Sequence, residues 1–354
     1  MLILSGIAGA PGVAFAADPP WKISSADGVS FLTLGFLAQP QLETVTTPDG
    51  RSTSKNMFLR RIRLIAGGRA TAKLSFFIET DSPNLGKDTA GGRKVEEYVF
   101  LQDVILTYAF SEKVQVDAGM LLFPLSHNTG QSAATLLATD YGPYSFVASE
   151  PTGSRIGRDY GIQARGYVLG KHLEYRVGAF QGYADPAATA PFRYAGRVVW
   201  YPFEAETGFF YGGTTLGARR IVAIGAGFDH QDDYAAQAVD VYVDQPLKGG
   251  DGLTVQLDYI HYNGGRTFTQ MPSQQTWLFE VGYYNGGRRL GPFAQLSGRG
   301  CADSALPAEN KVVVGLAWWA SGHRFNLKVG AGRLGRDGFP GRTQMVLQGQ
   351  VFMF

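Results

Sequence analysis

The sequence has little that would support a disulfide framework, a cysteine-based metal cage or a membrane-spanning helix. Its 354 residues include one cysteine, Cys301, which excludes an internal disulfide and any zinc site built from several cysteines. Beyond the first residues of the chain, no run approaches the ~20 apolar residues that a transmembrane helix needs, since the longest such run extends only from Val312 to Ala320. The 47 glycines also disfavour a helical protein, because glycine costs about 1 kcal/mol relative to alanine inside a helix.

Charge is scarce and balanced. Charged residues make up 18% of the chain, and 32 Lys and Arg against 30 Asp and Glu leave a formal net charge of +2. This balance excludes a polybasic nucleic-acid-binding coat and a strongly acidic disordered tail. We therefore expect no nucleic-acid partner.

The first residues have the pattern of an export signal. The stretch from Leu2 to Val13 is apolar or small, and Ala14-Phe15-Ala16 forms an A-x-A cleavage motif. We predict a signal peptide at 1–17 and a periplasmic N-terminal segment at 18–28. The alternative is a buried strand or helix, which the Pro11-Gly12 break fits poorly.

The rest of the chain alternates between apolar and polar residues. In residues 324–331, Phe, Leu, Val and Ala fall on one face and Arg, Asn, Lys and Gly on the other, as period-two strands require. A soluble β-sandwich also alternates, so the number and length of the strands carry the argument. About sixteen segments are predicted, most of them long enough to cross a membrane as tilted strands: 29–38, 57–67, 71–80, 98–109, 113–121, 159–168, 172–182, 192–203, 217–229, 236–246, 252–264, 275–285, 290–298, 310–320, 323–333 and 342–354.

This pattern predicts an all-β fold, a transmembrane antiparallel β-barrel over 29–354 in the Gram-negative outer membrane. Short connections such as 67–70 and 110–112 alternate with long ones, as short periplasmic turns and longer outer loops do. The connection at 203–216 is an exception, because it is long where a short turn is expected. The longest loop, 122–158, is expected to fold into the lumen and set the pore size; the alternative is an outer loop that contacts lipopolysaccharide or a neighbouring subunit. Its candidate constriction residues are Tyr141, Tyr144, Arg155 and Arg158.

A barrel of this size leaves an aqueous lumen, and the alternation directs many charged side chains into it. The acidic ones concentrate on the strands from 236 to 285, opposite the basic ones, which predicts a field across the pore and an anion preference. The alternative is that the basic side chains are only wetted wall residues or pair with nearby acids. The basic positions assigned to the lumen by alternation are Arg61, Arg63, Lys73, Arg165, Arg176, Arg193, Arg197, Lys311, Arg324 and Lys328.

Three stretches resemble a known family, the phosphate-selective porin O/P family of Gram-negative outer membranes. They are Phe58-Leu59-Arg60-Arg61-Ile62-Arg63-Leu64, Gly119-Met120-Leu121-Leu122-Phe123-Pro124-Leu125, and Arg193-Tyr194-Ala195-Gly196-Arg197-Val198 with Tyr201-Pro202. The resemblance implies a sixteen-stranded trimeric channel whose arginines pass anions towards a central phosphate site. Arg60, Arg61, Arg193 and Arg197 are the matching positions. Family members that bind phosphate carry a basic residue where this chain has Leu121-Leu122, so phosphate transport and general diffusion without anion selectivity both stay open.

No motif predicts catalysis, a cofactor or a metal site. The string at 330–335 matches a dinucleotide fingerprint, but no helix can follow it. His127 beside Ser126 leaves a lipid hydrolase as an alternative without a visible acid partner, and a structural or adhesive barrel with an occluded lumen also stays open.

The expected partners are small anionic solutes, outer-membrane lipid and lipopolysaccharide, further copies in a homotrimer, and the assembly machinery that reads a terminal phenylalanine, here Phe354. Phe352 and Phe354 share a face with Gln348 and Gln350, whereas Val351 lies on the opposite face, and a bulge or register change near Phe352 would reconcile the two.

Overall fold

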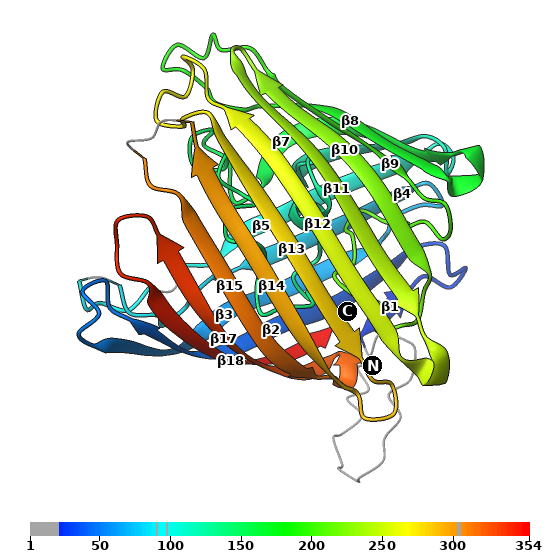
Figure 1. Ribbon diagram of the computed structural model, residues 1–354. Coiled ribbons are helices and arrows are strands. Elements are labelled where there is room, and N and C mark those ends of the chain that lie inside the picture. The colour runs from blue at the N-terminus through cyan, green and yellow to red at the C-terminus, as the bar shows by residue number, and fades with distance from the viewer. Residues whose placement is uncertain (1–20, 90, 97, 303–305) are drawn as a thin grey trace.

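The computed structural model describes residues 21–354 except 90, 97 and 303–305, and within them sixteen antiparallel strands close into one barrel (Figure 1). Each strand of the ring pairs with the next strand in sequence, except that β15 pairs with β17, and pairing of β18 with β2 closes the ring. The elements are β1 (Lys22–Ser24), β2 (Phe31–Thr46), β3 (Thr53–Arg69), β4 (Leu74–Asp81), β5 (Phe100–Ala109), β6 (Gln115–Leu122), α1 (His127–Gly130), β7 (Arg158–Val168), η1 (Leu169–Lys171), β8 (Leu173–Phe180), β9 (Arg193–Trp200), β10 (Ile221–Gln231), β11 (Tyr234–Pro246), η2 (Lys248–Gly250), β12 (Gly252–Asn263), β13 (Gln274–Tyr284), β14 (Leu290–Cys301), β15 (Glu309–Trp318), β16 (Ala320–His323), β17 (Phe325–Arg336) and β18 (Arg342–Met353).

The predicted all-β barrel of about sixteen strands is confirmed. The first barrel strand is longer than predicted, because β2 continues through Pro40 to Thr46. Proline lacks an N–H and is tolerated in a sheet at irregularities, and the pairing of β2 with β3 shifts register between Gln39 and Pro40. The predicted signal peptide at 1–17 lies outside the described residues. From the predicted segment at 18–28, β1 is described, and it pairs with the start of β2.

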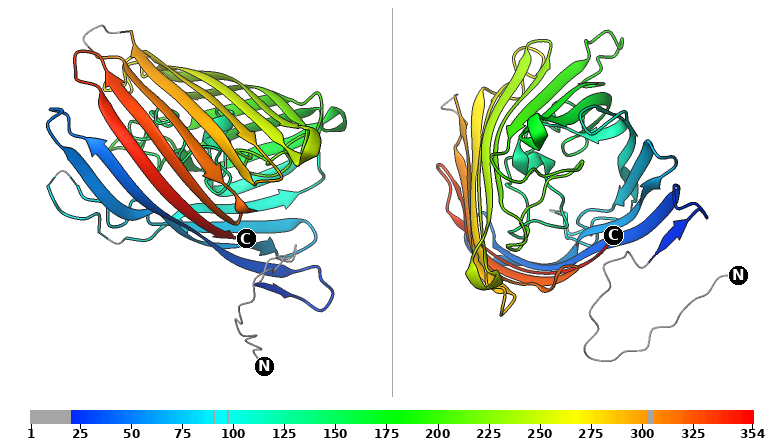
Figure 2. Two further views of the ribbon diagram at one scale, coloured as in Figure 1. Left: turned by 60° about the horizontal axis from the view of Figure 1, so that its bottom comes forward. Right: turned by 90° about the vertical axis from the view of Figure 1, so that its right-hand side faces the viewer.

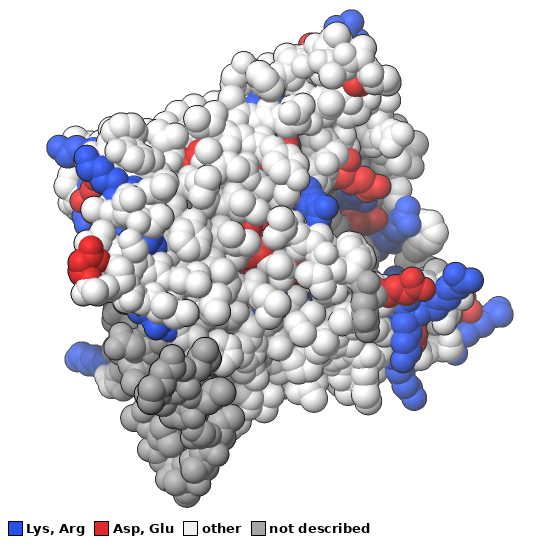
Figure 3. All heavy atoms as spheres, turned by 180° about the vertical axis from the view of Figure 1, so that it is seen from behind, with Lys and Arg blue, Asp and Glu red and all other residues white. Residues whose placement is uncertain are grey.

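The alternation of side chains separates an apolar outer face from a polar inner face. On β17, Leu327 and Val329 are exposed on the outside, whereas Asn326 and Lys328 are buried inside the barrel. Charged side chains gather towards the two ends of the wall, and most of the surface between them is uncharged (Figure 3). No helix in the described part of the chain has the length and apolar character to cross a membrane.

Connections differ in length at the two ends of the barrel, as predicted. Turns 70–73, 110–114 and 169–172 lie at the end where the C-terminus lies, and connections 82–99 and 123–157 lie at the other end. By the rule that periplasmic turns are short, the end with the C-terminus is the periplasmic end. Figure 2 shows further chain, coloured cyan to green, inside the ring of strands.

The structure has neither a bulge nor a register change near Phe352. Pairing of β18 with β2 keeps one register through Phe352, and its pairing with β17 is regular as far as Val351, so the Phe352 side chain stays on the inner face. The ring of Phe354 also lies against the inner face, 5.7 Å from the ring of Phe77 between centroids. Unbroken period-two alternation therefore holds to the end of the chain.

Candidate permeation path

The long connection between β6 and β7, residues 123–157 (the inserted loop), folds into the barrel as predicted. Residues 123–134 are almost entirely buried. The loop contains the one-turn helix α1, which Ser126 caps by accepting a hydrogen bond from the Thr129 amide. Asn128 then organises the chain beyond the helix, because its side-chain oxygen accepts hydrogen bonds from the Gly142 amide at 3.1 Å and the Ser145 hydroxyl at 2.8 Å.

Amide side chains on the opposite wall hold the inserted loop by its backbone. The loop carbonyls from 133 to 140 would be unsatisfied in the lumen without partners, and a buried carbonyl without a hydrogen bond is costly. The side-chain ammonium group of Lys328 donates hydrogen bonds to two of these carbonyls, those of Leu136 and Ala138. Four glutamine side-chain amides donate hydrogen bonds to further loop carbonyls at 2.8 to 3.2 Å: Gln39 to Ala133, Gln350 to Ala134, Gln348 to Thr139 and Gln295 to Asp140.

A second segment enters the barrel from the periplasmic end. This is the β9–β10 connection, residues 201–220 (the periplasmic connection), which includes the exceptional stretch noted in the sequence. Its Tyr211 amide donates to the Gly130 carbonyl and its Tyr211 carbonyl accepts from the Ser132 amide, both at 2.9 Å. The carbonyl of Thr214 accepts a hydrogen bond from the ring of His323 at 2.9 Å. The connection thus spans the lumen from β9 to the opposite wall.

His127 joins the two inserted segments. Its Nε2 lies 2.8 Å from a carboxylate oxygen of Glu206 in the periplasmic connection. The imidazole stacks between Tyr211 and Tyr242, with ring centroids 5.0 and 4.0 Å away. Ring stacking and a charge-assisted hydrogen bond together fix the contact between the segments.

Four of the predicted pore arginines lie beneath these segments. Each is buried and paired with a wall carboxylate, and each also donates to an inserted backbone or side-chain oxygen. They therefore satisfy and hold the inserted segments, and removing one would leave a buried carboxylate uncompensated. The pairs are Arg165 with Asp117, Arg176 with Glu174, Arg193 with Asp229 and Arg197 with Asp240, and the accepting oxygens are those of Gly208, Phe209, Thr152 and Leu125.

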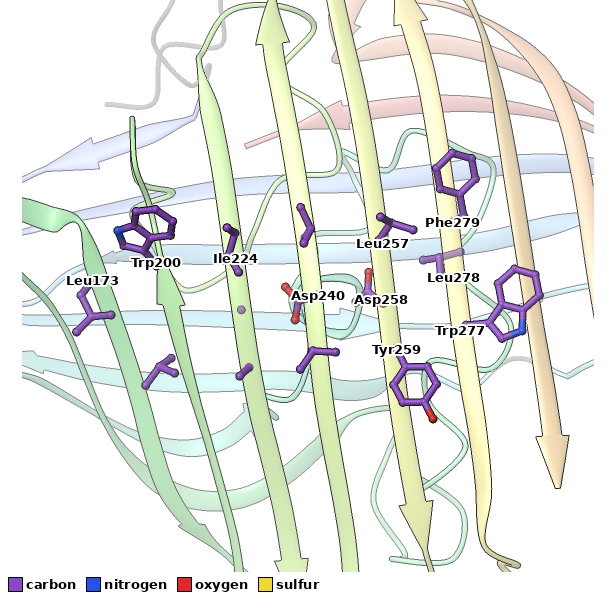
Figure 4. Close-up of a pocket in the computed structure, with 15 residues that line it drawn as sticks. Leu173, Trp200, Ile224, Asp240, Leu257, Asp258, Tyr259, Trp277, Leu278 and Phe279 are labelled. Atoms are coloured by element: carbon purple, nitrogen blue, oxygen red, sulfur yellow. The ribbon is translucent and has the colours of Figure 1, made fainter. Parts of the chain in front are cut away.

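The acidic strands β11 to β13 are covered in the same way. Asp240 and Asp258 lie side by side on β11 and β12 (Figure 4) and are direct partners in register. Asp258 accepts a hydrogen bond from the amide of Asn128 in the inserted loop at 3.0 Å. On the outer face of the same wall an apolar groove is lined by residues such as Trp200 and Leu257 (Figure 4). The acidic wall is thus sealed from the open part of the lumen.

Two cavities inside the ring lie along β2 to β5. A cavity of about 320 Å³ at the long-loop end (the outer cavity) and one of about 370 Å³ at the periplasmic end (the inner cavity) share Arg63 and Arg158 in their linings. Arg63 is paired with Glu79 at 2.7 Å and with Asp81 at 2.9 Å, and Arg158 with Asp103 at 3.3 Å. The guanidinium groups of Arg63 and Arg158 therefore lie between the two cavities.

A β-bulge directs two consecutive arginines into the outer cavity. Gln39 pairs with Arg61 and Pro40 with Leu59, so Arg60 is the extra residue. Because of this extra residue, Arg60 and Arg61 both point inward and clamp the carboxylate of Asp140 in the inserted loop, at 2.7 and 2.6 Å. Burial alone raises the pKa of Asp140, but the two guanidinium groups outweigh it and hold that pKa well below its usual range.

The other predicted residues are placed differently. Tyr141 lines the outer cavity, and Lys328 is buried against the loop carbonyls. Tyr144 packs near Arg299 at the wall, and Arg155 is exposed beside the ring of Phe100, 4.4 Å from its centroid. Arg324 lies in the turn between β16 and β17 rather than within a spanning strand.

Sequence reasoning missed the periplasmic connection as part of the lumen. Phe209 and Phe210 of this segment line the inner cavity. Two signals were available, the unusual length of 203–216 and the consecutive aromatic residues within it. Within the described residues no group of three or more His, Cys, Asp or Glu side chains is arranged to hold a metal ion.

Comparison with known proteins gives one family and several solved structures of similar fold. Residues 43–218 match the family described as phosphate-selective porin O and P. No curated protein matches the chain. Similar solved structures include the anion-selective porin from Comamonas acidovorans (TM-score 0.61, 11% identity, 92% of this chain and 100% of that one), OprB of Pseudomonas putida (0.65, 9%, 92% and 95%) and the outer membrane channel DcaP of Acinetobacter baumannii (0.59, 11%, 94% and 99%). At these identities the structures establish the shared barrel fold.

Proposed function

Because the chain is an outer-membrane porin of the phosphate-selective porin O and P family, we propose that it passes small hydrophilic anions through the outer and inner cavities. The inserted loop and the periplasmic connection fill the rest of the lumen. Solutes then move along the wall formed by β2 to β5. Passage is passive.

The observation that carries this proposal is the charge of the outer cavity. Its lining contains two carboxylates, Asp81 and Asp140, and five basic side chains: Arg60, Arg61, Arg63, Arg158 and Lys311. Glu79 and Asp103, which pair with Arg63 and Arg158, reduce this excess to five basic side chains against four carboxylates. The acidic side chains of β11 to β13 are buried beneath the inserted loop and do not reduce it further. Basic groups at a constriction favour anions, and low-dielectric walls focus their field.

Phosphate is a candidate solute within this class. Arginine binds phosphate oxygens through paired N–H donors, and Arg60 and Arg61 present two guanidinium groups side by side. The family description and the anion-selective porin of Comamonas acidovorans support the same direction. The carboxylate of Asp140 between these arginines favours small monovalent anions instead, so the proposal is anion preference, with phosphate as one solute to be tested.

A planar bilayer containing the purified protein under a KCl gradient tests the proposal. We expect a zero-current potential in the chloride direction and a fall in chloride current when phosphate is added. A near-zero or potassium-directed potential would refute anion preference. It would instead support a general diffusion pore, which the pairing of Asp140 with both arginines favours.

We also propose that the protein has no catalytic role. The Ser126 hydroxyl is buried and caps α1, and His127 is committed to Glu206 and its two stacking partners, so neither is available to a lipid substrate. Lipid hydrolysis by the purified barrel would contradict this.

Further proposals concern assembly and processing. A homotrimer is expected from porin architecture, and a trimeric form is recorded for the structurally similar OmpT of Vibrio cholerae; native mass spectrometry tests it. Contacts with lipopolysaccharide and recognition of Phe354 by the assembly machinery are proposed with it. Removal of residues 1–17 as a signal peptide is tested by N-terminal sequencing of the protein from outer membranes.

A further inference from the structure

The inner cavity is lined by aromatic rings that come together from three separate parts of the chain. Phe77 belongs to β4, Phe209 and Phe210 to the periplasmic connection, and Phe352 and Phe354 to the C-terminus. The ring of Phe77 makes edge contacts with Phe210 at 5.3 Å and with Phe354 at 5.7 Å between centroids. This lining is unusual for a path that carries only hydrated inorganic ions, because ring faces do not replace water around an ion.

Glycines in the wall make room for this cluster. A Cβ atom at Gly67 would lie 2.6 Å from the ring of Phe354, and one at Gly35 would lie 2.9 Å from it. Both distances are too short for real side chains. The terminal ring is therefore seated in a recess of β2 and β3, and the chain end takes part in shaping the cavity.

Polar groups also line the inner cavity, and two of them are shared with the outer cavity. Arg63 and Arg158 line it together with Glu79 and the amide Gln131. The cavity of about 370 Å³ thus combines an apolar, aromatic body with a few convergent polar groups, which is the composition of sites that bind small organic molecules. Guanidinium groups recognise carboxylates with paired hydrogen bonds.

From this lining we propose that the porin prefers amphipathic organic anions, namely monocarboxylates with a planar aromatic body, over inorganic or short aliphatic anions. The inference rests on the proposed anion path and names its solute class. The carboxylate passes from the arginines of the outer cavity to Arg63 and Arg158 while the ring packs edge-to-face against Phe77 and Phe210.

The carboxylates around the arginine pair favour a single negative charge on the solute. Glu79 lines the inner cavity, Asp81 lines the outer cavity, and both accept hydrogen bonds from Arg63. A second negative charge on the solute would be held close to these carboxylates, where like charges repel. Dicarboxylates and phosphate dianions are therefore expected to pass less readily than monocarboxylates.

Reversal potentials with benzoate and acetate as the test anions, measured at neutral pH in planar bilayers holding the intact protein, test the proposal. We expect benzoate permeability to exceed acetate permeability by about threefold to tenfold, the effect of one aromatic contact. Phe210→Ala should lower this ratio about threefold, and the chloride-to-potassium ratio is measured alongside it. Phe339→Ala, a substitution at an exposed ring in the β17–β18 turn, is the matched control and should change neither ratio.

The outcomes separate this inference from the proposed function. A wild-type channel without chloride preference overturns the anion path and this inference with it. A chloride-selective channel in which benzoate passes no better than acetate overturns the solute class alone. If Phe210→Ala does not fold, the series acetate, butyrate and benzoate on the wild type decides, because a rise at butyrate equal to that at benzoate would contradict aromatic recognition.

Discussion

Replacing Asp140 by asparagine removes the only carboxylate that the inserted loop contributes to the lining of the outer cavity. An anion passing about 4 Å from this carboxylate is repelled by about 1 kcal/mol in bulk water and by about 4 kcal/mol at an effective dielectric constant near 20. At 0.1 M salt, screening reduces the lower value to roughly two thirds. Cations lose an equal attraction, so Asp140→Asn should raise the chloride-to-potassium permeability ratio about tenfold.

The loop should keep its position in this variant, because the glutamine side chains and Lys328 hold its backbone independently of the Asp140 carboxylate. Zero-current potentials at 0.1 M and 1 M KCl provide the assay, and the change should shrink to about twofold at 1 M, where the Debye length is about 3 Å. Asp49→Asn makes the same charge change on the exposed β2–β3 turn. Equal effects of the two substitutions would refute the reasoning, since charge at the rim would then matter as much as charge in the cavity.

Three further changes probe the inserted segments. Lys328→Met removes two hydrogen bonds to loop carbonyls and should lower the thermal midpoint and increase current noise in single-channel records. His127→Ala should increase the single-channel conductance more than Glu206→Gln, because it also removes the stacking on both tyrosine rings. Equal conductance in the wild type and both variants would contradict the proposal that His127 holds the two inserted segments together. Because the pKa of Asp140 is lowered, its ion pairs stabilise the fold fully at any pH above the ordinary aspartate pKa of about 4. This stabilisation is lost only as the pH falls through the lowered pKa. The selectivity difference between wild type and Asp140→Asn should therefore persist at about pH 3, where an ordinary aspartate is mostly protonated, and its disappearance there would show an ordinary carboxyl.

The barrel was predictable because its strands face two environments and alternate accordingly. Asn326 and Lys328 point inward and their neighbours outward with no other information needed. The insertion of the 122–158 loop followed from its length and small residues. The partners of the inward charges were not predictable, because Arg61 meets Asp140 across 79 residues, and Arg158 meets Asp103 across 55, only once the ring has closed.

The periplasmic connection shows the same limit. Its length was visible, but its place inside the lumen depends on contacts such as Tyr211 with Gly130, between two segments that have no regular periodicity. The alternation of apolar and polar residues makes no prediction for such segments. It also assigned Arg61 and Arg63 to the lumen while leaving Arg60 to a family resemblance, since alternation alone turns Arg60 towards lipid.

The bulge at Arg60 has a consequence for how such a pore can change over generations. In a regular strand, a substitution alters one inward side chain and leaves the other face as it was. Here one additional residue in β3 brings an extra guanidinium inward without replacing anything on the lipid side. Deleting that residue would restore the regular register and remove one positive charge from the outer cavity in a single step. Insertions and deletions of one residue are thus a route by which this barrel gains or loses pore charge while its apolar belt is preserved.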